Sequence, residues 1–324
     1  MSGAIFDVIT TGRVGVDLYP LQSGRTLAAV ATFAKSLGGS PTNVAVAAAR
    51  LGCSTAVITK VGDDPFGTFV RQALHGYGVD DRWVGTDPQL RTPIAFCELF
   101  PPDHFPILFY RQPVAPDLRI EAAELDVEAI AAARVFWTTS TGLSAEPSRS
   151  ALITALEARG EDRSWDERPT IHDLDYRPGF WSSARDAGRA IRDALRYATV
   201  AVGNREEVAV AVGTRDPRKG AAALLDLGPQ LAIVKCGGAG VYAAAADGTE
   251  LTLDAVPVHV VNGLGAGDAF GGALCAGIVH GWGLEVTLQA ANAAGAHVAA
   301  RLGCAPEMPT REQLRALAGM ALDA

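Results

Sequence analysis

The stretch NGLGAGDAFGGALCAGIVHG, from Asn262 to Gly281, decides the fold because a glycine-rich turn leads straight into an apolar helix pattern. Phe270, Leu274 and Ile278 recur within it near helical spacing, which predicts a helix. Glycine inside an ordered element costs roughly 0.5–1 kcal/mol relative to alanine. Several glycines beside a single acid therefore indicate that bare backbone is required here.

The predicted helix carries Asp268 in its first turn, and Gly265, Ala266 and Gly267 lead into it. A helix N-terminus attracts anions because its N–H groups are unpaired and its dipole is positive there. Small residues also let the main chain approach an anion closely. Two interpretations of the acid stay open at this point. It is a helix cap, or a base that takes a proton from a hydroxyl while neighbouring N–H groups hold a phosphoryl group.

Strand-like and helix-like segments alternate along most of the chain. The strand-like segments are continuous apolar runs, which are typical of a parallel sheet covered by helices on both faces. The alternation predicts an α/β fold with a doubly wound, mostly parallel sheet flanked by helices. The predicted strands include 7–12, 55–62, 133–141, 169–177, 197–204 and 230–237, and the predicted helices include 42–52, 65–78 and 146–160.

Two segments break this alternation. Residues 13–22 and 93–113 resemble strands without intervening helices, and the second segment resembles a hairpin around Pro101, Pro102 and Asp103. Short antiparallel pieces of this kind often form a lid over a site. We therefore predict a small β-sheet lid beside the main sheet.

The composition excludes several classes of function. A formal net charge of −8 disfavours binding to nucleic acid or to a membrane surface, because both need a basic face. No apolar run reaches the roughly 18–20 residues of a membrane span. The five cysteines are dispersed and form no CxxC pair, which indicates reduced core residues. Since the N-terminus also lacks a signal-peptide pattern, we expect a cytoplasmic protein.

A second glycine-rich motif, LGGSPTNVAVAAARLG at 37–52, lies far upstream of GAGDAFGGAL. The two motifs, their order and the strand–helix rhythm between them resemble the ribokinase-like, PfkB-type carbohydrate kinases over essentially the whole chain. The resemblance implies a single kinase domain over 1–324. Lid strands at roughly 13–36 and 92–115 would be inserted into it.

The same resemblance implies phosphoryl transfer from ATP to a sugar hydroxyl, with Asp268 as the catalytic base. The N–H groups of Gly265, Ala266 and Gly267 would form the anion hole, which suits a transition state that needs alignment and charge stabilisation. The chain departs from the family at one place, where Gly263–Leu264 replaces a common threonine pair. Neither residue has a side-chain hydroxyl that could contact phosphate.

Three further motifs resemble the nucleotide and metal side of the family. VGNREEV at 202–208 has the N-x-x-E spacing, which implies Asn204 near the phosphates and Glu207 organising Mg²⁺; taken alone, the same residues form an ordinary helix capping box. VKCGGAGV at 234–241 resembles the nucleotide-binding turn, and ANAAGAHVAAR at 291–301 resembles the helix beside adenine. The cofactor-binding residues implied by these motifs are Asn204, Lys235, Gly237, Gly240 and Asn292.

The sugar-binding positions of the family match Asp17, Gly38, Gly39 and Asn43. A carboxylate that accepts hydrogen bonds from two hydroxyls orients a polyol effectively. The alternative for Asp17 is a solvated acid on a lid strand.

Two arginines imply that the acceptor is an acid. Arg111 in LFYRQP and Arg177 in HDLDYRP stand where relatives acting on sugar acids carry an arginine, whose planar fork can hold a carboxylate. The segment from Asp173 to Pro178 most resembles the 5-dehydro-2-deoxygluconokinases, which adds Asp173 to the expected substrate-binding residues. Arg111 could instead form a surface ion pair.

The resemblance thus implies ATP and Mg²⁺ as cofactors, with a monovalent cation as a further candidate, and a homodimer formed through the lid. The acceptor could instead be 2-keto-3-deoxygluconate, fructose or another sugar, and a nucleoside kinase fits the arginines less well. A relative that binds sugar or nucleotide without catalysis is the alternative from a different class.

Overall fold

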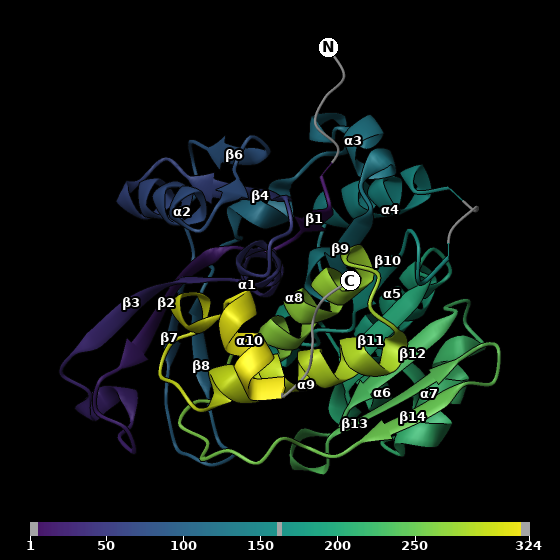
Figure 1. Ribbon diagram of the computed structural model, residues 1–324. Helices are drawn as coiled ribbons and strands as arrows, with labels where there is room; N and C mark the ends of the chain where they lie inside the picture. Colours follow the sequence, from purple (N-terminus) through teal and green to yellow (C-terminus); the bar gives the residue numbers. More distant parts are fainter. Residues whose placement is uncertain (1–5, 161–163, 319–324) are drawn as a thin grey trace. The chain divides into compact units, whose positions relative to one another are not determined.

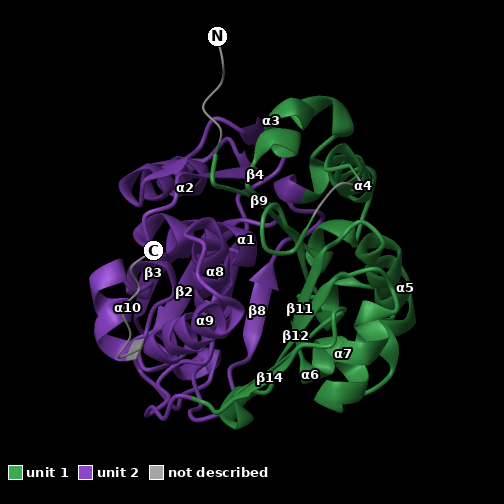
Figure 2. Cartoon of the chain, turned by 45° about the vertical axis from the view of Figure 1, so that its right-hand side comes forward, with its two compact units in different colours: residues 1–11, 118–255 green, residues 12–117, 256–324 purple. Residues whose placement is uncertain are grey.

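The computed structural model describes residues 6–160 and 164–318, and it divides into two compact units (Figures 1 and 2). Unit 1 comprises Met1–Thr11 and Leu118–Ala255, and unit 2 comprises Gly12–Asp117 and Val256–Ala324. The chain passes between the units more than once, so each unit is built from segments distant in sequence. The predicted single domain over 1–324 stays a prediction.

Unit 1 contains a mostly parallel sheet whose strands follow the order β14-β13-β12-β11-β10-β9-β1. In this sheet β1, β9, β10, β11 and β12 pair in parallel with one another. Strand β13 pairs antiparallel with both β12 and β14 at one edge. This arrangement confirms the predicted mostly parallel α/β sheet. The strands are β1 (Val8–Thr11), β9 (Val135–Thr139), β10 (Thr170–Asp173), β11 (Val200–Asn204), β12 (Leu231–Lys235), β13 (Val241–Ala245) and β14 (Glu250–Leu253).

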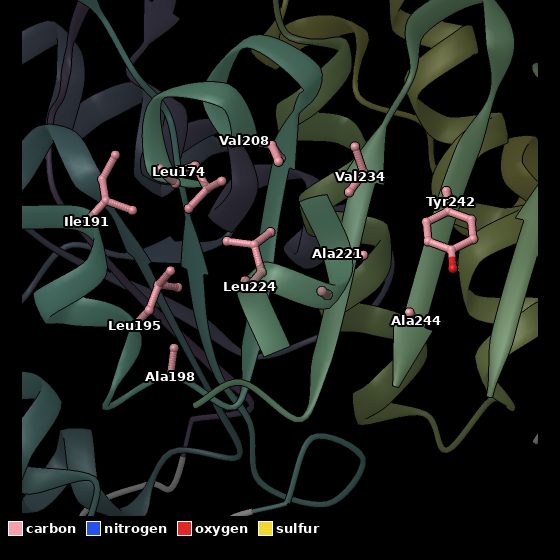
Figure 3. Packing of buried hydrophobic residues seen from close by; sticks show 13 residues of the cluster. Leu174, Ile191, Leu195, Ala198, Val208, Ala221, Leu224, Val234, Tyr242 and Ala244 are labelled. Carbon is pink, nitrogen blue, oxygen red and sulfur yellow. The ribbon is translucent and has the colours of Figure 1, made fainter. Parts of the chain in front are cut away.

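Helices of unit 1 pack their apolar faces against this sheet. Figure 3 shows the buried cluster in which Ile191 and Leu195 of one helix, Leu224 of another and Val234 of β12 pack around the sheet. The helices are α3 (Val127–Ala132), α4 (Ser148–Ala158), α5 (Ala184–Leu195), α6 (Arg205–Val212) and α7 (Pro217–Leu225). Since β10, β11 and β12 are parallel neighbours, their carboxyl ends meet at one edge, which is where open α/β sheets bind ligands.

Unit 2 contains parallel strands, a separate four-stranded sheet and several helices. The parallel strands are β4 (Thr55–Gly62), β5 (Val79–Asp80) and β6 (Val84–Asp87). The four-stranded sheet has the order β3 (Phe33–Gly38), β2 (Gly15–Pro20), β7 (Ile94–Cys97) and β8 (Ile107–Tyr110). The helices are α1 (Ser40–Arg50), α2 (Pro65–Gly76), α8 (Ala266–Val279), α9 (Leu284–Ala299) and α10 (Arg311–Ala318).

The four-stranded sheet confirms the strands predicted outside the main alternation. Strands β7 and β8 pair antiparallel, as a hairpin requires, and β2 lies between β3 and β7. Its role as a lid stays a prediction.

Close packing of α8 against α1 explains one glycine of GAGDAFGGAL. A Cβ added at Gly272 would lie 2.2 Å from the Cβ of Ala47 and 2.9 Å from the carbonyl oxygen of Val44. Real Cβ atoms do not approach so closely, so only glycine lets the two helix backbones meet at this point. The two helices thus pack side by side within unit 2 (Figure 1), and the hydrogen bond from Ser40 to Asp268 joins their N-terminal turns.

Across residues 6–160 and 164–318, no helix is both long and apolar enough to cross a membrane.

The buried imidazole of His172 in β10 is expected to make the fold sensitive to acid. Its Nδ1 lies 2.8 Å from Thr138 Oγ1 and its Nε2 2.9 Å from Ser140 Oγ, and burial lowers the pKa of His172 from 6.5 to about 4. In the unfolded chain His172 therefore binds a proton below about pH 6.5, whereas in the folded chain it stays neutral down to about pH 4. The contribution of this histidine is complete above pH 6.5 and is lost as the pH falls toward 4.

At 1.36 kcal/mol per pKa unit, this loss amounts to about 3 kcal/mol of unfolding free energy. Urea titrations at pH 7 and pH 4 should show that His172→Gln loses less stability between the two pH values than the wild type, by about that amount. An equal loss in both proteins would contradict the assignment.

Candidate active site

The site in unit 2 is built around the carboxylate of Asp268 in the first turn of α8, as the sequence predicts. Gly265, with a φ of +83°, is the N-cap residue of this helix and supplies no side-chain cap. The hydroxyl of Ser40 donates to Asp268 Oδ1 at 2.7 Å, and Asn43 Nδ2 donates to Oδ2 at 2.8 Å. Both carboxylate oxygens are therefore fixed by the N-terminal turn of α1, so the two signature motifs converge on one acid.

The amide of Asn43 has a second polar atom that the protein leaves unused. Asn43 is buried, and no donor among the described residues forms a hydrogen bond with its Oδ1. A buried acceptor without a donor is costly. This atom is free to accept a hydrogen bond from a bound molecule, and the role of Asn43 in binding sugar stays a prediction.

Sequence reasoning missed two side chains next to the acid. Ser40 lies inside the recognised N-terminal motif, so its place between Gly39 and Pro41 was a usable signal. The Cys304 Sγ lies 3.9 Å from Asp268 Oδ2, and nothing in its local sequence indicated this contact. Burial, with the nearby charges of Asp268 and Asp17, raises the pKa of the Cys304 thiol, so this thiol stays protonated beside the carboxylate.

Gly38 and Gly39 are required by the close approach of neighbouring groups. A Cβ at Gly38 would lie 2.1 Å from Asp17 Oδ1, and one at Gly39, whose φ is +101°, would lie 2.3 Å from the carbonyl oxygen of Arg13. The hydroxyl of Tyr19 donates to Asp17 Oδ2 at 3.1 Å. Asp17 is therefore a half-buried, hydrogen-bonded acid, and its role in binding sugar stays a prediction.

Arg111 follows β8 and forms an ion pair with Asp117, with Nη2 and Oδ2 2.7 Å apart. Only 8% of the Arg111 side chain and 2% of the Asp117 side chain are exposed. The alternative of a surface ion pair is therefore wrong, because the pair is buried. Binding of a substrate carboxylate by Arg111 stays a prediction.

In unit 1, the carboxyl ends of three adjacent strands carry predicted site residues. Asp173 ends β10, Asn204 ends β11 and Lys235 ends β12, and the register pairs Asn204 with Lys235. The Lys235 Nζ lies 3.8 Å from Asp173 Oδ1. The parallel topology thus gathers residues from three distant motifs at one sheet edge.

Asn204 and Glu207 form a capping box at the start of α6. Asn204 Oδ1 accepts from the N–H of Glu207 at 3.0 Å, and Glu207 Oε2 accepts from the N–H of Asn204 at 2.7 Å. The interpretation of the N-x-x-E motif as a helix capping box is therefore confirmed. It does not conflict with a metal role, which stays a prediction.

The remaining predicted nucleotide residues lie in a turn and on a helix. Gly237 and Gly240 flank the turn between β12 and β13, with φ values of +58° and +83°. A Cβ at Gly240 would lie 1.9 Å from the Leu253 carbonyl oxygen, whereas the space around Gly237 is open. The turn thus presents accessible backbone, as phosphate binding needs. Asn292 lies on α9 in unit 2 and is half-buried.

The carboxylates near the predicted nucleotide residues are compatible with a magnesium ion that takes few protein ligands. Within the described parts of the chain, no three His, Cys, Asp or Glu side chains group into a metal site of their own. Mg²⁺ commonly takes one or two carboxylates and completes its octahedron with water and phosphate oxygens. One carboxylate such as that of Glu207 is compatible with this mode.

The chain belongs to the pfkB family of carbohydrate kinases, whose model matches residues 6–311. The 5-dehydro-2-deoxygluconokinase of Clostridium tetani is 32% identical over 315 residues, covering 95% of this chain and 91% of that protein. The enzyme of the same name from Photobacterium profundum is 34% identical over 314 residues, covering 95% and 93%. These findings confirm the family that the two motifs indicated.

The fold is shared with a solved carbohydrate kinase. The fructokinase from Vibrio cholerae O395, in a form with fructose, ADP and calcium ion bound, has a TM-score of 0.83 and is 27% identical. The match covers 97% of this chain and 99% of that chain. The protein is therefore a carbohydrate kinase with the ribokinase-like fold.

Proposed function

We propose that this protein transfers the terminal phosphate of ATP to the terminal hydroxyl of 5-dehydro-2-deoxy-D-gluconate. The observation that carries the proposal is the Asp268 carboxylate at the N-terminus of α8, held by Ser40 and Asn43 from the other signature motif. Relatives named 5-dehydro-2-deoxygluconokinase over nearly the whole chain support this choice of acceptor.

Asp268 acts as the base in this proposal. It accepts the proton of the attacking hydroxyl, while the N–H groups of Gly265, Ala266 and Gly267 stabilise the phosphoryl group in transfer. The first N–H groups of a helix have no intrahelical partner, and Gly265 offers no side-chain cap, so these donors can serve an anion.

The acceptor is oriented by polar groups at both of its ends. Asp17 and Asn43 would bind hydroxyls, Asn43 through its buried Oδ1, and the bare backbone of Gly38 and Gly39 permits a close approach. The acidic end would be bound by Arg111 and Arg177, with Asp173 contributing to the same acceptor. A guanidinium binds a carboxylate through two parallel hydrogen bonds.

The nucleotide and the metal complete the cofactors. Asn204, Lys235, Gly237, Gly240 and Asn292 would bind ATP, and Glu207 would help to hold Mg²⁺. Mg²⁺ supplies charge neutralisation on the phosphates when bound. A monovalent cation is a further proposed cofactor.

A homodimer through the four-stranded sheet is the proposed assembly. Leu108 and Tyr110 of β8 are exposed by 49% and 61%, which leaves an apolar strand face for a second copy. We place the reaction in the cytoplasm, which suits five cysteines that are all free thiols.

A panel of acceptors assayed with ATP and Mg²⁺ tests the proposal. The expected kcat/KM for 5-dehydro-2-deoxy-D-gluconate exceeds that for D-fructose by about 10–100-fold, because a charge-assisted hydrogen bond contributes about 1.5–3 kcal/mol. A preference for 2-keto-3-deoxygluconate, fructose or a nucleoside would overturn the acceptor but not the chemistry. Failure to transfer phosphate to any acceptor in a single turnover would indicate a non-catalytic relative.

A further inference from the structure

The backbone at Asp175, just after β10, is unusual. Among the described residues, it is the one non-glycine position with a positive φ, at +20°. Such conformations persist only where the surroundings enforce them, and they gather at functional sites. The side chain of Asp175 is only 2% exposed. Unit 1 therefore contains a buried carboxylate at a position of strained backbone.

The carboxylate of Asp175 is engaged at both oxygens. Its Oδ1 lies 3.0 Å from Arg177 Nη2, and its Oδ2 accepts from the Thr141 hydroxyl at 3.3 Å. Thr141 Oγ1 in turn lies 3.0 Å from Thr139 Oγ1 at the end of β9. The acid is therefore anchored to the neighbouring strand, and it fixes one end of the guanidinium.

The Arg177 guanidinium still has capacity for an anion. Its side chain is 35% exposed, and its Nε is buried without an acceptor among the described residues. Arginine carries five N–H donors, and the ion pair with Asp175 engages only the Nη2 end of the fork. A second carboxylate can therefore bind to the same guanidinium.

We propose that Asp175 is a positioning residue that holds Arg177 in the orientation required by the carboxylate of the acceptor. This inference rests on the proposed function, since it assumes an acidic acceptor. The contribution is geometric, because the charge of Asp175 by itself would repel a second carboxylate. Fixing the side chain in advance removes the entropy that a flexible arginine would lose on binding.

Replacing Asp175 with glycine and with asparagine tests the inference in steps. Glycine accepts a positive φ and removes the anchor, while asparagine tolerates this backbone and keeps a weaker, neutral hydrogen bond. We expect Asp175→Gly to raise the KM for 5-dehydro-2-deoxy-D-gluconate about tenfold or more, and Asp175→Asn to raise it less. The KM for ATP and the kcat should change by less than about threefold, because Asp175 acts only on the binding of the acid. A purely structural defect would instead change all three parameters. Asp193→Asn, at an exposed ion pair with Arg196, is the matched control with unchanged kinetics.

A double-mutant cycle with Arg177→Ala separates positioning from general damage. If Asp175 acts through Arg177, Asp175→Gly should raise the KM for the acid by less than about twofold further in the Arg177→Ala background. The inference would be overturned if the effects of the two substitutions were additive. It would also be overturned if Asp175→Gly left the KM for the acid unchanged or lowered it. Either outcome leaves the proposed function standing. If the wild-type enzyme phosphorylates no sugar acid, both are overturned.

Discussion

Replacing Asp268 with asparagine is expected to lower kcat by about 10²–10⁴-fold, which is the usual contribution of a positioned base. Asparagine has nearly the same shape but cannot accept the proton of the attacking hydroxyl. The surrounding hydrogen bonds can survive the change. The Asn43 Nδ2 donor would face the new amide oxygen, and the Ser40 hydroxyl can turn to accept from the new amide nitrogen.

Because the local geometry is kept, the affinity for ATP should stay within a few-fold of the wild type. Single-turnover assays measure the chemical step, and nucleotide titration by fluorescence or calorimetry measures binding. Asp193→Asn, the same change at an exposed position of α5, serves as the control and should retain full activity. A wild-type rate for Asp268→Asn would remove the base assignment, and with it the proposed mechanism.

The main elements of the fold could be predicted because their signals are local. The apolar run 55–62 is strand β4, with the predicted bounds, and Pro65 begins α2 as a proline at the first helical position should. The predicted helix begins within GAGD, at Ala266, and has Asp268 in its first turn. In each case neighbouring residues carry the information, so the chain could be read without knowledge of distant contacts.

Contacts between distant segments could not be predicted in the same way. Cys304 meets Asp268 only after the chain has folded, and no pattern around position 304 signals it. Asn204 and Glu207 show a different limit, because one spacing serves both a helix cap and a proposed metal ligand. Arg159 is the clearest example, since an arginine at the end of an amphipathic helix would ordinarily be exposed, yet it is buried.

The buried guanidinium of Arg159 at the end of α4 ties several backbone segments of unit 1 together. Its Nη1 donates to the carbonyl oxygens of Ile130 and Ala133, at 2.9 and 2.6 Å. Its Nη2 donates to the carbonyl of Pro169 at 3.0 Å, and its Nε donates to the hydroxyl of Thr170 at 3.1 Å. One side chain thus satisfies acceptors at the end of α3 and at the start of β10.

Arg159→Ala should therefore lower the free energy of unfolding by about 3 kcal/mol or more, because each buried acceptor left without a donor costs about 1–3 kcal/mol. Arg159→Lys should recover little of this loss, since an ammonium cannot reproduce the planar fork that reaches segments on different sides. Urea denaturation measures the effect, with Arg196→Ala as the control at an exposed arginine that should change stability by less than about 0.5 kcal/mol. If the two alanine variants were equally stable, the buried guanidinium would not hold the end of α3 to the start of β10. Hydrophobic packing alone would then have to account for the stability of this part of unit 1.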